Sequence, residues 1–406
     1  MRFKTRKRIF ALLTASVMAA AALPAMPVQA AGSAPQYDKI VILGDSISTR
    51  YALASGESSY YEILSDFTGA GVTNYAVSGY TTSDLLTLLE DESKQAAIKE
   101  ADLICISIGS NDILKPAHDY FDAYRQEGEL FMDIIKRLAK DGDPKYYIGQ
   151  LTAATRDARA QAIENYPLIE TALRDLNPDA EIVMESLYNP FEVRQQVAAS
   201  YSEDNEDMSN YEELMRYISN MENQLSKAMR NLETVKVAEV GNAYANAGWA
   251  FVGSGRNDVH PTETGHAMIA AVIMDLLGIT GKTSDVFTRS IENMIMGDYR
   301  RVSENSRKLL HRYANPGGRL FGDADDDGKI AAEDAQIVLQ RYTKGLASLS
   351  SAADFLTYEE FNAVDVTGDG EADVADAQCI LQYFTINLSQ KTVKWSELTG
   401  NPNAPD

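Results

Sequence analysis

The stretch KIVILGDS at residues 39–46 is an apolar run that ends in glycine and is followed by two polar residues. A short, uninterrupted apolar run of this kind is typical of a strand buried on both faces, as in a parallel sheet. Similar runs recur further along the chain, at residues 102–108, 181–187 and 235–240. Helix-like stretches lie between or after them, at about residues 83–99, 150–175, 210–232 and 262–277. This alternation predicts an α/β fold built on a parallel sheet.

The first 31 residues have the order of a secretory signal peptide. A basic cluster at residues 2–8 precedes an apolar run from Ile9 to about Ala25, and small residues follow at 28–30. The alternative is a membrane anchor, but the run is short for a span. Removing five basic residues with the signal changes the net charge from −22 to −27. Such an acidic surface argues against a nucleic-acid partner. We predict a secreted, extracellular protein with no membrane segment after cleavage.

The pattern changes near residue 281. Residues 37–280 carry the α/β pattern, in which the stretches 116–178 and 190–232 exceed a simple crossover and are interpreted as helical insertions that shape a substrate rim. Residues 281–319 are predicted to be a linker, polar and helical up to the break signal NPGG at 315–318. Residues 320–390 form a second predicted domain. The two cysteines, Cys105 and Cys379, are too few for a disulfide framework and are interpreted as buried thiols.

Ser46 lies where the first predicted strand ends, a position that faces the ligand-binding crevice of open α/β sheets. The turn into a helix also aims backbone N–H groups at this place. Taken alone, Ser46 is better explained as a helix cap than as a catalytic residue. Three more polar clusters stand at the ends of predicted elements: NYAVSG at 74–79, GSND at 109–112 and NDVHPT at 257–262.

Taken in order, these four segments resemble the sequence blocks of the SGNH/GDSL hydrolase family, and the resemblance covers about residues 37–280. It implies a three-layer, flavodoxin-like α/β domain in which Ser46 is the nucleophile and His260 the general base. The oxyanion hole would consist of the N–H groups of Ser46 and Gly79 and the side-chain amide of Asn111. Elementary chemistry agrees, because a serine hydroxyl needs a neighbouring base and the anionic intermediate needs preorganised donors.

Four histidines are available as the base, and only His260 lies at a loop–helix junction with proline next to it. His118 falls in an insertion and His311 in the linker. His266, on the last helix of the α/β pattern, is interpreted as a packing or surface residue. No histidine pair has the i, i+4 spacing of a metal site with carboxylates nearby, so no catalytic cofactor is predicted.

The third member of the triad departs from the family pattern. The family's acid stands three residues before the histidine, where this chain has Asn257, and Asp258 follows one residue later. Either Asp258 turns inward, or Asn257 or a backbone carbonyl orients the imidazole, or the enzyme works as a Ser–His dyad. An asparagine can hold the ring but cannot supply the charge that stabilises an imidazolium. The alternative, non-catalytic interpretation of Asp258 is that it caps the following helix.

The C-terminal region contains an internal repeat with a constant offset of 42 residues. Oxygen-bearing residues stand at positions one, three, five and twelve of two loops: Asp323, Asp325, Asp327 and Asp334, then Asp365, Thr367, Asp369 and Asp376. Gly328 and Gly370 take position six, where such a loop turns sharply, and Lys329 and Glu371 complete the predicted ligand sets. This spacing is that of a calcium loop, although with aspartate rather than glutamate at twelve. A solvated acidic loop is the alternative.

Two such loops, each followed by a helix, resemble a type I dockerin over about residues 320–390. The resemblance implies a small all-α domain, two structural calcium ions and a cohesin module of a scaffoldin as partner. Residues 332–333 (Ala-Glu) and 374–375 (Val-Ala) stand where partner choice is usually made, and they leave the cohesin type open. Calcium is expected to fold this region, because clustered carboxylates repel one another when empty.

Together these features predict a secreted serine esterase that removes acetyl or similar groups from plant polysaccharide and is attached to a cellulosome-like complex. The prediction of a polysaccharide substrate depends only on the association of dockerins with enzymes that degrade polysaccharides. The first alternative is a lipase or lysophospholipase acting on lipid esters, since the insertions could form an apolar groove. The alternative from another class is an esterase-like binding module with weak catalysis, and the absent acid at position 257 is its only support.

Overall fold

The computed structural model describes residues 36–129, 133–134, 137–138, 144–190, 205–245, 251–253, 259–295, 302–314, 319–348, 356–389, 391–401 and 404. The predicted signal peptide therefore lies outside the described residues. Within them, no helix is both long enough and apolar enough to cross a membrane.

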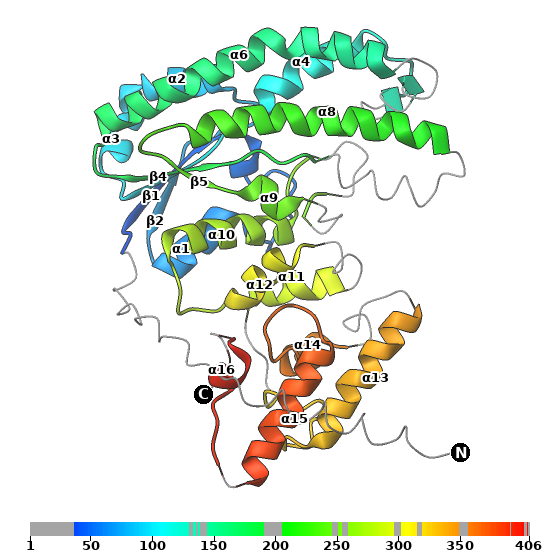
Figure 1. The fold of residues 1–406 in the computed structure, drawn as a ribbon. Helices are drawn as coiled ribbons and strands as arrows, with labels where there is room; N and C mark the ends of the chain where they lie inside the picture. Colours follow the sequence, from blue (N-terminus) through cyan, green and yellow to red (C-terminus); the bar gives the residue numbers. More distant parts are fainter. Residues whose placement is uncertain are drawn as a thin grey trace, which may run out of the picture. The chain divides into compact units, whose positions relative to one another are not determined.

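A five-stranded parallel sheet forms the centre of the larger part of the molecule (Figure 1). The strands lie in the order β2-β1-β3-β4-β5, and their bounds are β1 Lys39–Gly44, β2 Gly71–Asn74, β3 Leu103–Ser107, β4 Glu181–Glu185 and β5 Lys236–Ala238. β1 and β3 pair with Ile42 opposite Cys105, and both strands are buried almost throughout. Strands covered on both faces need apolar side chains on both faces, which is why their sequences read as continuous apolar runs.

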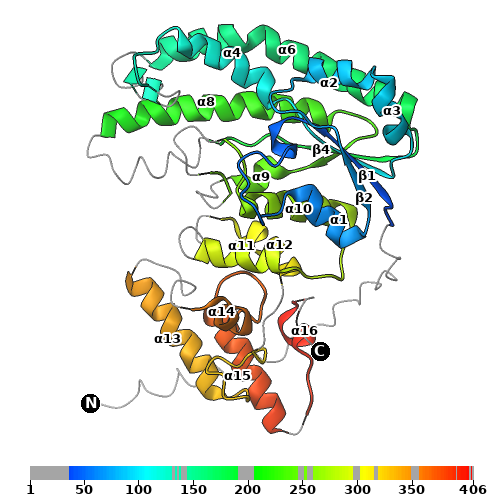
Figure 2. The same ribbon diagram turned by 180° about the vertical axis from the view of Figure 1, so that it is seen from behind.

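Helices cover both faces of the sheet, so the predicted three-layer α/β architecture is confirmed (Figures 1 and 2). One face carries α2 Thr82–Leu89, α3 Glu92–Lys99, α4 Ser110–Asp122, α6 Pro144–Leu176 and α8 Asn205–Arg230. The other carries α1 Tyr60–Thr68, α9 Val240–Tyr244 and α10 Glu263–Leu277. The strand order is that of a flavodoxin-like sheet, in which ligands bind at the carboxyl ends of the strands where the order reverses. That point lies between β1 and β3.

The helical stretches differ in detail from the sequence prediction. The stretch expected at 83–99 is two helices, α2 and α3, because the Asp91 side chain accepts a hydrogen bond from Ser93 N and caps a new helix. The stretch expected at 150–175 is longer and begins at Pro144. In the predicted insertions, α6 packs against α4 and α8 and forms an outer layer.

Residues 281–319, predicted to be a linker, contain α11 Asp285–Ile295 and α12 Glu304–Tyr313. Both helices pack against α10, and Phe287 and Leu310 are fully buried. The segment is helical as expected and contributes side chains to the same apolar cluster as α10. The division into domains stays a prediction.

The C-terminal region consists of α13 Ala332–Ser348, α14 Tyr358–Val364, α15 Val374–Leu388 and the short α16 Trp395–Thr399. α13 and α15 begin at the ends of the two acidic loops and pack against each other, as the duplicated sequence predicts. Cys105 is a fully buried free thiol, as expected, whereas the free thiol Cys379 is only half-buried.

Candidate functional site

A tight turn at the end of β1 presents Ser46. β1 ends at Gly44, whose φ is +124°, and a Cβ there would lie 2.0 Å from the carbonyl oxygen of Ser107 on β3. Only glycine fits this close approach. The next residue, Asp45, accepts a hydrogen bond from Ile47 N (3.1 Å) and caps the 3₁₀ turn Ser46–Ser48. The cap is therefore Asp45, and the alternative interpretation of Ser46 as a cap is wrong.

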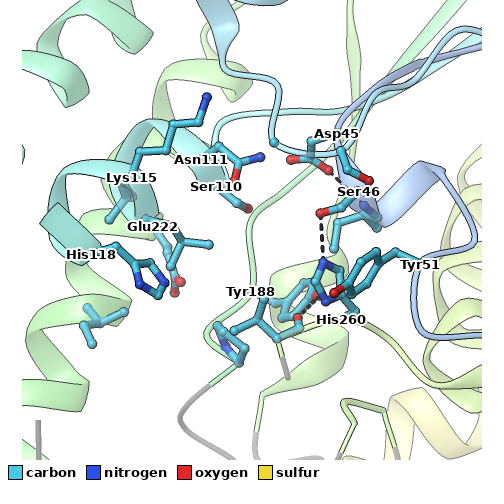
Figure 3. Close-up of a pocket in the computed structure, with 18 of the residues that line it drawn as sticks. Asp45, Ser46, Tyr51, Ser110, Asn111, Lys115, His118, Tyr188, Glu222 and His260 are labelled. Carbon is cyan, nitrogen blue, oxygen red and sulfur yellow. Dashed lines mark hydrogen bonds between the residues drawn. The ribbon is translucent and has the colours of Figure 1, made fainter. Parts of the chain in front are cut away.

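His260, 214 residues further along the chain, lies next to Ser46. Its Nε2 lies 2.9 Å from Ser46 Oγ (Figure 3). The loop that carries it is held by two backbone hydrogen bonds, from Gly253 N to His260 O and from Thr262 N to Phe251 O, both 3.0 Å. The Thr262 side chain then caps α10. His260 therefore stands two residues before the N-cap of α10, with its backbone hydrogen-bonded to Gly253.

Two further contacts surround His260. The Tyr188 hydroxyl donates to the carbonyl of Val259 at 2.7 Å, and the Tyr51 ring lies 4.1 Å from the His260 ring, centroid to centroid. The two candidates for the third triad position, Asn257 and Asp258, lie outside the described residues.

The predicted oxyanion donors border the same cavity as Ser46 and His260. Gly79, with φ +84°, follows β2, and Asn111 stands in the first turn of α4. Asn111 Nδ2 donates to the carbonyl of Tyr80 at 2.9 Å, which holds the amide in place. An amide nitrogen carries two hydrogens, so the group retains a second donor. The three segments that supply Ser46, Gly79 and Asn111 therefore converge at the edge of the sheet where β1, β2 and β3 end.

The other three histidines do not all lie where the sequence analysis predicts. His266 is buried and His311 is half-buried, and burial lowers the pKa of each to about 3. His266 packs in the core, where its Nδ1 accepts from Tyr60 N at 3.3 Å, as expected for a packing residue. His118 was set aside as a member of an insertion, but the structure places it in the wall of the cavity that contains His260. His260, not His118, lies within hydrogen-bond distance of Ser46, but the position of His118 in the cavity wall was not predicted.

The cavity has a volume of about 590 Å³. Besides the predicted residues, its lining includes Tyr51 from the loop after the 3₁₀ turn, Tyr188 after β4, and Glu222 from α8. Sequence reasoning missed all three. The only signal for Glu222 was its place in a stretch longer than a crossover needs, and nothing in the sequence distinguishes Tyr51 from an ordinary surface tyrosine.

Two buried carboxyl groups lie beneath the site. Burial raises the pKa of Asp45 to about 7 and that of Glu185 to about 8. Hydroxyl groups link this layer: Ser107 Oγ donates to Asp45, and Ser48 Oγ lies 2.8 Å from Ser107 Oγ and 2.7 Å from the Tyr60 hydroxyl. Most buried polar groups in folded proteins have hydrogen-bond partners of this kind.

The two acidic loops gather carboxylates as predicted. Oxygens of Asp323, Asp325 and Asp327 lie within 4.8 Å of one another, as do oxygens of Asp365, Asp369 and Asp376. In each loop the first aspartate is buried and accepts hydrogen bonds from two backbone N–H groups of the loop. Burial and neighbouring aspartates raise the pKa of Asp365 well above its ordinary value. Hard oxygen ligands crowded in this way suit a divalent calcium ion, which relieves their repulsion.

The remaining loop positions agree with such a site. Gly328 and Gly370, at position six, have φ of +79° and +80°. Asp334, at position twelve, accepts from Ala324 N (2.7 Å), and its counterpart Asp376 accepts from Thr367 N (3.0 Å). The carboxylate of Glu371 is paired with Arg307 at 2.8 Å. A ligand from Glu371 would therefore be its backbone carbonyl, as is usual at position seven.

Comparison with known families agrees with this geometry. Residues 42–268, more than half of the chain, match the model of the GDSL-like lipase/acylhydrolase family. The chain belongs to this family. Residues 321–385 match the type I dockerin domain, so the C-terminal region is a dockerin.

Individual relatives are distant. The uncharacterized protein YpmR of Bacillus subtilis is 24% identical over 199 residues, which are 49% of this chain. The chain spans 63% of the length of that curated relative. A lipase, Lip_vut3, from goat rumen metagenome has 16% identity over 59% of this chain and 97% of its own, with a TM-score of 0.41. A phospholipase A1 from Streptomyces albidoflavus has 15% identity over 59% and 99%, with a TM-score of 0.38.

Proposed function

We propose that this chain is a serine esterase with Ser46 as nucleophile and His260 as general base. The observation that carries the proposal is the 2.9 Å separation of Ser46 Oγ and His260 Nε2 at the wall of a cavity of about 590 Å³. Membership in the GDSL-like lipase/acylhydrolase family supports ester hydrolysis as the reaction. A hydroxyl within hydrogen-bond reach of an imidazole is the arrangement that nucleophilic catalysis needs.

The reaction follows from this arrangement. Ser46 Oγ attacks the ester carbonyl as its proton moves to His260 Nε2, and the negative charge that develops on the carbonyl oxygen is met by N–H donors. The N–H groups of Ser46 and Gly79 and the amide of Asn111 are the proposed donors, since all three residues border the cavity. His260 then gives the proton to the leaving alcohol. Water, activated by the same imidazole, releases the acid from Ser46.

His260 needs a group that orients its ring. Asp258, Asn257 or a backbone carbonyl remain the proposed candidates, and a Ser–His dyad is the fourth possibility. The Tyr51 ring on one face of His260 and the hydrogen bond from Tyr188 to Val259 restrict the imidazole in every case. An ionised Asp258 would in addition stabilise the imidazolium.

The dockerin supports a proposal for the partner, the location and the substrate of this protein. A type I dockerin points to a cohesin partner and hence to an extracellular, cellulosome-like complex that acts on plant cell walls, with acylated polysaccharide as the substrate. Two calcium ions would be held by the aspartates and Thr367 named above, with the carbonyls of Lys329 and Glu371. Calcium neutralises the crowded carboxylates and so fixes the starts of α13 and α15.

Hydrolysis of p-nitrophenyl acetate tests the esterase. We expect the Ser46→Ala and His260→Ala variants to lose at least about 10³-fold in kcat, as removal of a nucleophile or its base does elsewhere. Ser55→Ala is the matched control, because Ser55 is an exposed serine nine residues further along. Equal rates for wild type and Ser46→Ala would contradict the proposal. Acetate release from acetylated xylan, compared with hydrolysis of long-chain esters, then separates a carbohydrate esterase from a lipase.

A further inference from the structure

Hydrogen bonds join the two segments that carry the proposed oxyanion donors Gly79 and Asn111. Gly79 lies shortly before α2, and Asn111 stands in the first turn of α4. Asn111 Nδ2 donates to the carbonyl of Tyr80. The next residue, Asp112, is buried and accepts from N and Oγ1 of Thr82, at 3.0 and 2.7 Å. The spacing of the two donors therefore depends on how the start of α4 is held against the start of α2.

A third element, α6, takes part in this junction. It packs against both α2 and α4 (Figures 1 and 2). Asn165 of α6 is 2% exposed, and its Nδ2 donates to Thr82 Oγ1 at 2.9 Å and to Ser83 Oγ at 3.0 Å. Its Oδ1 accepts from Gln161 Nε2 at 3.0 Å. Both hydrogens and the oxygen of this buried amide are therefore used, and both hydrogens are directed at the start of α2.

The next residue of α6, Tyr166, contacts the other segment. It is fully buried, and its hydroxyl lies 3.4 Å from the carbonyl oxygen of Ile108, just before the turn into α4. Gly109 in that turn has a φ of +117°, and a Cβ there would lie 2.2 Å from the Tyr166 hydroxyl. Only glycine allows this approach. Two consecutive residues of α6 thus contact the starts of α2 and α4, one residue for each.

These contacts form one continuous chain of hydrogen bonds. Thr82 Oγ1 accepts from Asn165 and donates to Asp112, so the chain runs from α6 through α2 to α4. Buried hydrogen bonds fix positions more closely than apolar packing does, because each has a narrow range of length and direction. An oxyanion donor acts only when it stands about 2.7–3.1 Å from the developing charge. A loosened junction would therefore weaken the oxyanion hole.

We propose that Asn165 is a positioning residue for the oxyanion hole. Through the chain of bonds that ends at Asp112, it sets the spacing between Gly79 and Asn111. This inference rests on the proposed esterase function and deepens it, because it gives a helix of the predicted insertion 116–178 a part in catalysis. Asn165 lies outside the lining of the cavity, so its effect reaches the reaction only through the two donors.

Kinetics of the full-length, calcium-loaded protein with p-nitrophenyl acetate test the proposal. Asn165→Ala should lower kcat roughly tenfold and leave KM within about twofold, since a misplaced donor affects the transition state more than the bound ester. Thr82→Val removes the hydroxyl in the middle of the chain and should lower kcat in the same way. Thr82→Ser retains that hydroxyl and should keep kcat within about twofold of wild type. A Thr82→Val variant as active as Thr82→Ser would contradict the proposal.

Asn177→Ala is the matched control. Asn177 is also a buried asparagine, 5% exposed, and its Nδ2 donates to the carbonyls of Ile98 and Ala101 at 2.8 and 2.9 Å. These contacts lie next to the start of β3, whereas the site lies beyond the end of that strand. Asn177→Ala should lower the urea midpoint about as much as Asn165→Ala does, with kcat unchanged. An equal fall in kcat for both variants would show that any lost buried hydrogen bond reduces activity, and the proposal would be wrong.

A double-mutant cycle with Asn111→Ala separates positioning from a general loss of structure. If Asn165 acts through the oxyanion hole, Asn165→Ala should cost clearly less in kcat when residue 111 is already alanine. Equal costs in both backgrounds would overturn the proposal. A lowered kcat in Asn111→Ala with none in Asn165→Ala would overturn this inference alone. Ser46→Ala activity equal to wild type would instead overturn the esterase function on which it rests.

Discussion

Replacing Glu185 with glutamine should stabilise the protein at high pH. Glu185 ends β4, is 3% exposed, and has an Oε1 atom with no hydrogen-bond partner within the described part of the chain. Burial, and after it the negative charge of Asp45, raises the pKa of Glu185 from 4.5 to about 8. At neutral pH the folded protein therefore holds a protonated carboxyl group here, and glutamine is its uncharged isostere.

The sign and size follow from proton linkage. The pKa of this carboxyl is higher in the folded than in the unfolded state, so its protonated form favours folding. Below pH 4.5 the group is protonated in both states, and the protein has its full free energy of unfolding. Part of that free energy is lost as pH rises from 4.5 to about 8. At about 1.4 kcal/mol per pH unit, the loss is on the order of 4 to 5 kcal/mol for wild type. The Glu185→Gln variant lacks this loss, because glutamine does not titrate.

Urea denaturation at pH 5 and pH 9, in calcium-containing buffer, measures the effect. The variant should be close to wild type at pH 5 and clearly more stable at pH 9, with unchanged m values. Glu164→Gln on α6 is the control, since Glu164 is exposed. The free energy of unfolding of this variant should differ from that of wild type by the same small amount at pH 5 and at pH 9. A difference between Glu185→Gln and wild type that does not depend on pH would refute the reasoning, because it would show that Glu185 does not change its charge on folding.

Three further outcomes are expected. Asn111→Ala should lower kcat for p-nitrophenyl acetate by about 10²–10³-fold, the usual cost of one oxyanion donor, and a kcat within threefold of wild type would remove Asn111 from that role. Gly44→Ala should destabilise the protein by about 3 kcal/mol or more in urea denaturation, because its Cβ would clash with the carbonyl of Ser107; an unchanged midpoint would contradict this. An Asp323→Ala, Asp365→Ala double variant should lose calcium-dependent cohesin binding in a pull-down assay, and binding that survives a chelator would exclude calcium from the interface.

Much of the site was predictable because it is encoded in short segments. β1 and the turn after it place Ser46 by local rules: a buried apolar run, a glycine without a Cβ, and a capping aspartate. The two acidic loops are similar, since the aspartates of each come from twelve consecutive residues. His260 could be selected because a loop–helix junction with proline is also a local pattern. For the turn and the acidic loops the chain's own spacing sets the geometry, whereas the contact of His260 with Ser46, 214 residues away, is set by the fold.

Other features depend on contacts between distant segments. His118 and Glu222 stand on different helices, α4 and α8, and meet the cavity only because those helices pack over the end of the sheet. The separation of His118 and Glu222 in the sequence does not predict that both line the same cavity. The raised pKa of Glu185 is likewise a consequence of burial that its neighbours in sequence do not predict.

The sequence by itself therefore determined the parallel sheet, the turn that presents Ser46, the candidate base and the two acidic loops. Only the tertiary structure decided which side chains form the opposite wall of the cavity, and that the exposed ring of Tyr51 lies against His260. The physical reason is that strand burial, turns and metal loops obey short-range steric and spacing rules. The composition of a cavity depends on how long helices pack, which is set by many weak contacts between residues far apart in the chain.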